Sequence, residues 1–531
     1  MLKSEADQAE PVRRGSRRLR LGRRRGAAAL AWAAGAIVVF ALFLKVSVDY
    51  RSISDGANNA LQAWDMLHGH LLLHGWILGD ATFYTLELPL LAVSEALFGL
   101  HTIAVHVAEA LVYLIVAACA VAIAVKDSRG PSRGARAAVV VAVLAAPALV
   151  WSDAWLPLGF PDHTGTTVFL LVSCLLIDRV TAPRYTAPLL CLILCAGQIS
   201  DVTVRYVAVP AIVAVCAYRM LADRKVATGD GAHLLAAVLS VPLSLAVRKA
   251  MLHFGAYLMV APKTKLAPIR LWPHNAAVTW LSLRELYGAH GAAGYRPAGP
   301  IAIFGYACLL ATAAGILVAI WRWRTSRRAD QVLLVAIAVN LAVYVISTLP
   351  SPRTPHDLVA VLACGAVLAA RALVPARIAN RVTALAASVL ALIAALLPLS
   401  LTAAQHPPIS QYAPLISWLQ AHRLSHGLGD YWGGSEVTLE SGNQIQIRTV
   451  QVVGGRKITP YAWESDTAWY DPARHYANFI LIDGPNHDLG LTVERIFGQP
   501  ASTYSVDSWK VLVYRKNLLT DVKPAALPAT S

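Results

Sequence analysis

Apolar segments long enough to cross a lipid bilayer recur along this chain, and short arginine-rich loops separate them. The first covers residues 27–48, the second covers residues 102–125, and the last covers residues 382–401. A helix needs about 20 predominantly apolar residues to span the hydrocarbon core of a membrane. We count about eleven segments that approach this length. The sequence therefore predicts a polytopic α-helical membrane protein and excludes a soluble enzyme.

The positive charge of the chain is concentrated outside the apolar segments. The protein has 531 residues, of which 56% are hydrophobic and 15% charged, and its formal net charge is +15. Much of the excess lies in the tail of residues 1–26 and in loops such as KDSRGPSRGAR at residues 126–136. Lysine and arginine are retained on the cytoplasmic side of membranes, where they also meet anionic lipids. We therefore expect no nucleic-acid binding, and we predict a multi-pass protein of the plasma (inner) membrane with a cytoplasmic N-terminus.

This topology divides the chain into a basic cytoplasmic tail (1–26), a transmembrane domain (27–404) and an extracytoplasmic region (405–531). Pro407 and Pro408 mark the last boundary. The final region contains one segment with a helical pattern and several with the alternation or β-branched composition of strands: 412–422, 444–453, 478–483 and 509–515. We expect a small α/β domain outside the cytoplasm.

The first outer loop, residues 49–100, is too polar to cross the bilayer. Ser54 and Asp55 indicate a helix start, because a short polar oxygen can accept the free N–H groups of the first turn. Apolar residues then recur at helical spacing, and polar residues fall on the opposite face, which we expect to meet water: Asn58, Asn59, Gln62 and Asp65. A second apolar segment runs from Glu87 to Phe98 and Gly99, and it is too short for a full span.

This order of parts resembles the first extracytoplasmic loop of the GT-C membrane glycosyltransferases, in particular the protein O-mannosyltransferase and aminoarabinose-transferase branch. The matching features are Asp55 soon after the first span, a helix covering 63–69, Pro89, and the ending Leu97-Phe98-Gly99. The resemblance covers the first third of the chain. Two departures stand out: Gly56 follows Asp55 where the family often has a second acidic residue, and Glu87-Leu88-Pro89 replaces a basic residue before a Pro pair.

The resemblance implies a GT-C-like fold with a catalytic first outer loop. It also implies transfer of a sugar from a polyprenyl-phosphate donor to a cell-envelope acceptor, which is a glycan, lipid or protein. Such a reaction needs a carboxylate that takes the proton of the acceptor and cations that stabilise the departing phosphate. Asp55 is the predicted base. The alternative is that Asp55 only caps its helix.

Three polar residues of the second outer loop are candidates for orienting the acceptor: Asp153, Asp162 and His163. Asp162 and His163 follow Pro161, so a plain turn is the alternative. Asp162 and His163 could also be two ligands of a divalent metal ion, but the sequence identifies no further ligands and no certain cofactor.

Cations on the predicted outer side are candidates for contacting the donor phosphate, because positive charge is disfavoured there without a reason. They are Arg205, Arg353, Lys263, Lys265 and Arg270. Arg205 follows Asp201 by four residues, so a helical ion pair is its alternative. For the run at 263–270 the alternative is contact with lipid headgroups.

Aromatic residues of the C-terminal region, namely Trp463, Trp469 and Tyr470, can stack on sugar rings, or they are ordinary core and surface aromatics.

Two other classes of function stay open, a transporter or flippase of lipid-linked intermediates and an inactive GT-C-like scaffold. A glycosyltransferase gathers its polar residues at the outer face, whereas a carrier needs a site near the midplane of the membrane.

Overall fold

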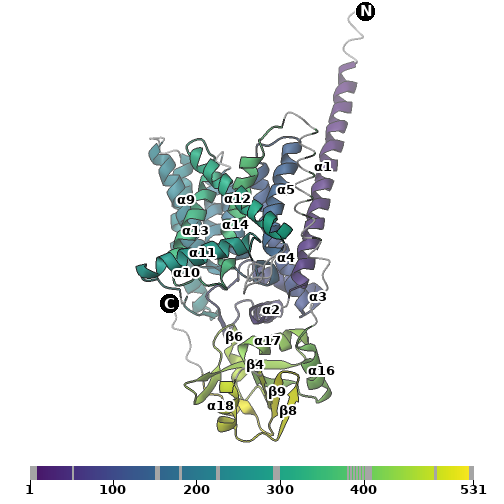
Figure 1. Cartoon of the computed structure of the whole chain (residues 1–531), viewed down its shortest axis with the longest axis vertical. Coiled ribbons are helices and arrows are strands. Elements are labelled where there is room, and N and C mark those ends of the chain that lie inside the picture. Colours follow the sequence, from purple (N-terminus) through teal and green to yellow (C-terminus); the bar gives the residue numbers. More distant parts are fainter. Residues whose placement is uncertain are drawn as a thin grey trace, which may run out of the picture.

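The computed structural model describes residues 9–50, 53–149, 156–178, 182–222, 228–262, 264–290, 299–378, 410–483 and 487–524, with single positions between 382 and 400. Asp153, Lys263, most of the predicted last span and the boundary at Pro407 lie outside these residues. A helical bundle forms the larger part of the molecule, and a C-terminal domain packs against one of its ends (Figure 1). We call the end of the bundle that lies against this domain the domain-facing end.

Helices occupy the positions of the predicted spans. They are α1 (Ala9–Val48), α4 (Thr102–Val125), α5 (Pro131–Ala145), α7 (Thr164–Ile177), α8 (Pro183–Ser200), α9 (Thr203–Ala222), α10 (Thr228–His253), α12 (Gly299–Trp321), α13 (Arg328–Ile346) and α14 (Val359–Leu373). Among the described residues, seven helices are long and apolar enough to cross a membrane. The chain is therefore a polytopic helical membrane protein, as predicted. The count of about eleven spans stays a prediction.

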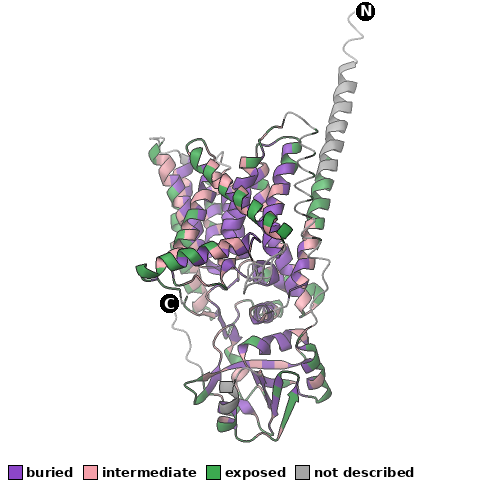
Figure 2. Ribbon diagram, in the orientation of Figure 1, coloured by how far each residue is buried: buried purple, intermediate pink, exposed green. Residues whose placement is uncertain are grey.

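Exposed residues line the outside of the bundle (Figure 2), and many of them are large and apolar. On α12, the large residues Ile303, Leu310 and Leu317 are each about two thirds exposed. A soluble bundle would bury such a stripe, whereas lipid tails solvate it. The interior is one continuous cluster of small and branched residues that joins most of the helices.

Arginine-rich loops lie at the end of the bundle away from the C-terminal domain. Several cations there have an acidic partner: Arg328 contacts Asp230 at 2.6 Å, and Lys126 contacts Asp178 at 3.1 Å. The separation of the basic loops from the domain agrees with the charge pattern of the sequence. Which side faces the cytoplasm remains a prediction.

The C-terminal domain is a six-stranded mixed sheet with the order β5-β4-β3-β7-β9-β8. Its strands are β3 (His426–Gly429), β4 (Gln446–Val453), β5 (Lys457–Pro460), β7 (Phe479–Asp483), β8 (Ser502–Val506) and β9 (Trp509–Val513). One face packs on α16 (Ala413–Ala421) and α17 (Tyr431–Glu440), and the other face packs on α18 (His487–Phe497). The predicted helix at 412–422 and three predicted strands are confirmed; β3, β5 and β8 were not predicted.

A second, three-stranded sheet joins the domain to the bundle. It consists of β1 (Trp76–Leu78) from the first outer loop, β2 (Leu258–Met259) from a later loop, and β6 (Ser465–Asp466) from the domain. In β6, Asp466 pairs with Trp76 and Ser465 pairs with Ile77. Three segments far apart in the sequence thus hold the domain against the bundle.

The first outer loop forms α2 (Ser54–Leu67) and α3 (Glu87–Phe98), which confirms both predicted helices. The expected water-facing side of α2 is wrong, however. Asn58, Asn59 and Gln62 are each about 1% exposed. They are buried because α17 of the C-terminal domain packs against α2 (Figure 1). Amphipathic spacing identified the helix, but a second domain, not water, covers its polar face.

Candidate active site

Asp55 lies in the first turn of α2, where the helix meets the C-terminal domain. The hydroxyl of Tyr431 donates a hydrogen bond to Asp55 Oδ1. The same hydroxyl lies 2.9 Å from Oε2 of Glu464. We call these three residues the Asp55 group. One hydroxyl from the domain thus stands between two carboxyls, one from the bundle half and one from the domain.

Asp55 does not cap its helix. The capping residue of α2 is Ile53, and no side chain makes the cap hydrogen bond. The carboxylate instead turns to Tyr431. This removes the structural alternative that the sequence left open, because Asp55 is not needed to close the helix end. Its place in the first turn still favours a negative charge through the helix dipole.

The carboxyls of the Asp55 group hold protons more tightly than free carboxyls do. Burial raises the pKa of Asp55, while the hydrogen bond from Tyr431 and the charge of His356 oppose the rise. Burial, followed by the charge of Asp55, raises the pKa of Glu464 well above its usual value. A base with a raised pKa in an enclosed site is a common feature of catalytic centres.

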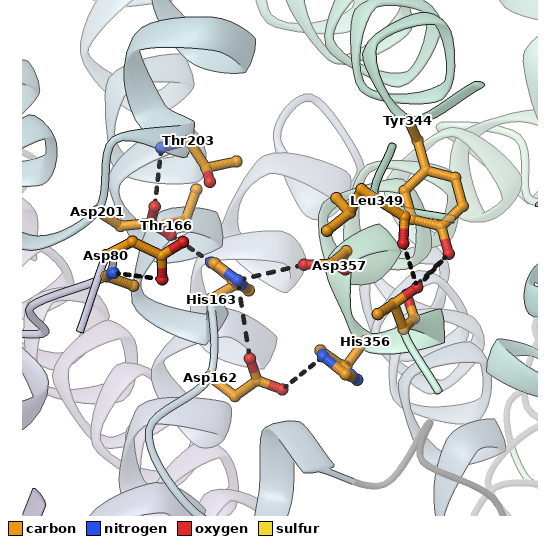
Figure 3. Close-up of polar contacts among 12 residues, drawn as sticks. Asp80, Asp162, His163, Thr166, Asp201, Thr203, Tyr344, Leu349, His356 and Asp357 are labelled. Carbon is orange, nitrogen blue, oxygen red and sulfur yellow. Dashed lines mark hydrogen bonds and ion pairs between the residues drawn. The ribbon is translucent and has the colours of Figure 1, made fainter. Parts of the chain in front are cut away.

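A second cluster surrounds His163 at the start of α7 (Figure 3). The ring nitrogen Nδ1 lies 2.6 Å from Asp201 Oδ2, and Nε2 lies 3.2 Å from Asp357 Oδ1. We call His163, Asp201 and Asp357 the His163 group. Burial disfavours a charged imidazole, but the two carboxylates outweigh it and raise the pKa of His163 well above its usual value. Burial likewise opposes ionisation of Asp201, yet the imidazolium lowers its pKa to about 2.

Asp162 lies between the two groups. Its Oδ1 is 3.9 Å from His163 Nε2, and its Oδ2 is 3.6 Å from Nε2 of His356 in η4 (Pro355–Leu358). Burial raises the pKa of Asp162 to about 6, and the charge of Asp55 contributes to the rise. Both nitrogens of His163 are occupied by carboxylates, so of the predicted acceptor-orienting pair only Asp162 keeps an oxygen without a hydrogen bond.

A cavity of about 320 Å³ opens beside the His163 group. Its polar wall includes Asp80, His163, Asp201 and Asp357, and Lys265 adds a cation. Its other wall is apolar and comes largely from α9 and α13: Tyr206, Val207, Val343, Ile346 and Leu349. A cavity that combines carboxylates, one cation and an apolar wall suits a molecule with a polar head and an apolar tail.

Glu87 anchors the first outer loop inside the bundle. Its Oε1 accepts a hydrogen bond from the backbone N–H of Gly165 at 2.9 Å, and its Oε2 lies 3.3 Å from the hydroxyl of Ser200. A side chain at Gly165 would overlap this carboxylate, so glycine is needed there. Burial raises the pKa of Glu87 to about 7. The residue that departs from the family pattern is therefore a buried contact at the N-terminus of α7.

The predicted phosphate-contacting cations are spread apart. Lys265 lines the cavity. Arg205 does not: its guanidinium lies 3.2 Å from Gln198 Oε1 and 3.5 Å from the hydroxyl of Ser244. The alternative ion pair between Arg205 and Asp201 is wrong, because Asp201 pairs with His163. Arg353 and Arg270 are exposed, and neither lines the cavity.

The predicted sugar-stacking aromatics make contacts within the protein. Trp469 packs edge-on against Trp76, with ring centroids 4.9 Å apart, and the guanidinium of Arg448 lies 4.1 Å from its ring. The hydroxyl of Tyr470 donates to the carbonyl of Thr449 at 2.5 Å. Trp463 lies beside Gly79, next to Glu464. Of the three, Trp463 is the one that adjoins the Asp55 group.

No set of three His, Cys, Asp or Glu side chains within the described residues is arranged to hold a metal ion. The carboxylates nearest to such an arrangement are those of the His163 group, and there the imidazolium already balances them. The roles predicted for the site residues, including any metal, remain predictions.

Several residues at this junction were not among the candidates from the sequence: Tyr431, Glu464, His356 and Asp357. His356 and Asp357 lie in the short polar segment PSPRTPHD (350–357), which follows the apolar segment 332–349. The sequence therefore placed them on the predicted outer side of the membrane. Nothing local marks Tyr431 or Glu464, because their importance comes only from the docking of the domain on α2.

No family model matches the chain, and no curated protein matches it in sequence. Among solved structures, ArnT from Cupriavidus metallidurans in the apo state is 14% identical with a TM-score of 0.55, and the match covers 94% of this chain and 100% of that one. The chain has the GT-C fold. The same ArnT bound to undecaprenyl phosphate is 12% identical with a TM-score of 0.55, covering 91% of this chain and 98% of that one.

An oligosaccharyltransferase from Archaeoglobus fulgidus also matches, with 11% identity and a TM-score of 0.45, over 84% of this chain and 69% of that one. This score is too low to support a shared fold. The ArnT matches confirm the resemblance predicted from the first outer loop and extend it to most of the chain. At these identities the likeness shows the fold alone.

Proposed function

We propose that this protein is an integral-membrane glycosyltransferase that takes a sugar from a polyprenyl-phosphate donor. It passes the sugar to a hydroxyl of a cell-envelope acceptor on the outer face of the plasma membrane. The observation that carries the proposal is the position of Asp55, a non-capping carboxylate in an enclosed junction at the domain-facing end. The polyprenyl donor is an inference from the fold of ArnT and from the half-apolar cavity.

In the proposed reaction, Asp55 is the base. The acceptor oxygen attacks the anomeric carbon and its proton passes to Asp55, while the bond from that carbon to the phosphate oxygen breaks. The departing polyprenyl phosphate keeps the electron pair of that bond. One base is enough, because phosphate is a good leaving group, and attack from the opposite face inverts the anomeric centre.

The remaining candidates take supporting roles in this proposal. Lys265 is the cation nearest to the donor phosphate, as a point charge on the cavity wall. Asp162, whose Oδ2 makes no hydrogen bond to a described residue although it lies 3.6 Å from His356 Nε2, orients the acceptor beside Asp55. Arg205 is withdrawn from the phosphate site, because its guanidinium turns toward α8 and α10.

The placement of polar groups supports a transferase over a carrier. Carboxyls of the first outer loop, of the α7 start and of η4 gather at one end of the bundle, whereas a carrier would need its site near the middle. An inactive scaffold has no use for an enclosed, non-capping carboxylate.

The proposal is tested with purified protein in detergent, offered a panel of polyprenyl-phosphate sugars with envelope glycans, lipids and peptides as acceptors. We expect release of polyprenyl phosphate together with a glycosylated product. If no donor in the panel is consumed, while proteoliposomes containing the protein move polyprenyl-phosphate sugars across the bilayer, the transporter replaces the transferase. If neither occurs, the scaffold remains.

A further inference from the structure

We propose that Glu464 and Tyr431 of the C-terminal domain are positioning residues for Asp55. Glu464 stays protonated and donates to the oxygen of Tyr431, so that the single hydroxyl proton of Tyr431 is directed onto Asp55 and keeps this carboxylate ionised. The effect on catalysis rests on the proposed function, but the charge state of Glu464 does not.

The argument begins with counting protons. Tyr431 lies within hydrogen-bond distance of both carboxyls, but a phenol has one proton to give. If both carboxyls were ionised, one of them would face the lone pairs of the phenol oxygen in a buried place. An unmade hydrogen bond to a buried charge is costly. One carboxyl must therefore carry a proton of its own and act as a donor.

The two carboxyls are not equivalent in this respect. Asp55 lies in the first turn of α2 and is partly exposed, so the helix dipole and nearby solvent favour its ionised form. Glu464 is 4% exposed and has no cation within ion-pair distance among the described residues. Burial raises the pKa of Glu464 well above its usual value. The proton therefore belongs on Glu464.

The fold holds both residues in place by separate contacts. Tyr431 begins α17, which packs on α2. Glu464 immediately precedes β6, which pairs with β1 of the first outer loop. Its backbone has a φ of 49°, a left-handed conformation that is uncommon for glutamate. On the other side, Oε1 of Glu464 comes within 3.4 Å of where a side chain at Gly79 would begin. Such a constrained conformation clusters at functional sites.

The groups around Asp55 require that Glu464 keep its proton if Asp55 is to stay ionised. The charged and titratable groups that face it come from four elements: His356 of η4, Asp162 before α7, Tyr431 and Glu436 of α17, and Tyr461 and Glu464 of the segment before β6. Carboxyls outnumber the one histidine. Ionising Glu464 as well would push the proton back onto Asp55 and remove the base.

The sugar-transfer step balances without using the proton of Glu464. Asp55 Oδ1 is held by Tyr431, so the acceptor proton goes to the other oxygen, Oδ2, as the sugar–phosphate bond breaks. Asp55 then loses this proton to water, and the hydrogen bonds of the group return unchanged.

Three variants test the proposal by the pH dependence of sugar transfer. In Tyr431→Phe the donor to Asp55 is lost, so we expect the acidic limb of the rate profile to move up by about one to two pH units. In Glu464→Gln a neutral donor to Tyr431 is kept, so we expect the limb to stay in place. Tyr461→Phe is the matched control, because its ring packs at a tilt with its centroid 4.8 Å from that of Tyr431, but the two hydrogen bonds that define the Asp55 group do not involve its hydroxyl.

Infrared difference spectroscopy at neutral pH reads the charge state directly and does not need activity. We expect Glu464→Gln to remove the absorption of a protonated carboxyl group. Loss of a carboxylate band instead, or an acidic limb that moves in Glu464→Gln as far as in Tyr431→Phe, would overturn the proposal. If wild type transfers no sugar, the proposed function fails, and the infrared band still decides the state of Glu464.

Discussion

Two groups of buried polar side chains meet at the domain-facing end, and they differ in how their charge is balanced. In the His163 group, one imidazolium lies between Asp201 and Asp357, at 2.6 and 3.2 Å. In the Asp55 group, two carboxyls share a neutral hydroxyl. The first group pulls the pKa of Asp201 down to about 2 by its imidazolium, against burial. In the second, burial raises the pKa of Asp55 and of Glu464.

This difference in charge balance indicates a structural role for one group and a chemical role for the other. A buried carboxylate paired with an imidazolium stays ionised. In the His163 group, these ion pairs connect the start of α7, the end of α8 and η4. Among the described residues Asp55 has no such close partner, and burial raises its pKa, so it accepts a proton more readily than a paired carboxylate, as a general base must. We therefore propose a structural role for the His163 group and proton transfer for Asp55.

The largest effect on stability is expected from Asp201→Asn. Breaking a buried ion pair by removing one partner costs about 3–5 kcal/mol, because the other charge is left uncompensated. The pKa of Asp201 is lowered, so its contribution is present above its unfolded pKa and is lost as pH falls toward 2. The pKa of His163 is raised, so its contribution is full below its unfolded value and is lost as pH rises through the folded one.

The destabilisation by Asp201→Asn should thus be greatest between about pH 4 and 6.5, the unfolded pKa values of the two groups. Thermal unfolding of the detergent-solubilised protein across this range measures it. If the loss were the same at every pH, the pair would not be ionic and the comparison between the two groups would fail.

Glu87→Gln is expected to stabilise the protein at high pH only. The pKa of Glu87 is raised by burial to about 7, so its charged form destabilises the fold increasingly as pH rises from the unfolded value to 7. Glutamine keeps the acceptor for the N–H of Gly165 and carries no charge. We expect a gain on the order of 2 kcal/mol at pH 8 and almost none at pH 4.5. A loss of stability at pH 8 would show that the ionised carboxylate is needed at the N-terminus of α7.

Lys265→Gln should have the smallest of these effects and should act on donor binding. Removing one partly solvated charge from the cavity wall is expected to raise KM for the polyprenyl-phosphate donor about tenfold, equivalent to about 1.4 kcal/mol, with kcat little changed. Arg270→Gln is the control, since it removes the same charge from an exposed position that does not line the cavity. Equal changes in the two variants would mean that only the overall charge of the surface matters.

The helices of the bundle and their order could be predicted, because an apolar segment long enough to cross a bilayer and an arginine-rich loop are each visible in a short stretch of sequence. The segments at 102–125 and 87–98 agree with α4 and α3 at their bounds. In the same way, the alternation of residues 444–453 located β4. Each of these depends on a period that neighbouring residues carry by themselves.

The site was predicted less well, because its geometry depends on contacts between distant segments. The polar face of α2 gave no sign that α17 would cover it, and Tyr431 lies 376 residues after Asp55. Arg205 follows Asp201 at helical spacing, but Asp201 ends α8 and turns to His163 instead. Spacing identifies residues on one helix face, whereas partners across a junction are set by tertiary packing.

The most direct test of the central claim compares donor binding and sugar transfer in Asp55→Asn. Asp65→Asn is the matched control, because Asp65 belongs to the same helix but is held by Trp76 Nε1 at 2.9 Å. We expect Asp55→Asn to remain folded and to bind polyprenyl phosphate as wild type does. Its transfer rate should fall by about 10²- to 10⁴-fold, and Asp65→Asn should keep its rate. Transfer by Asp55→Asn at the wild-type rate would show that Asp55 is not the base.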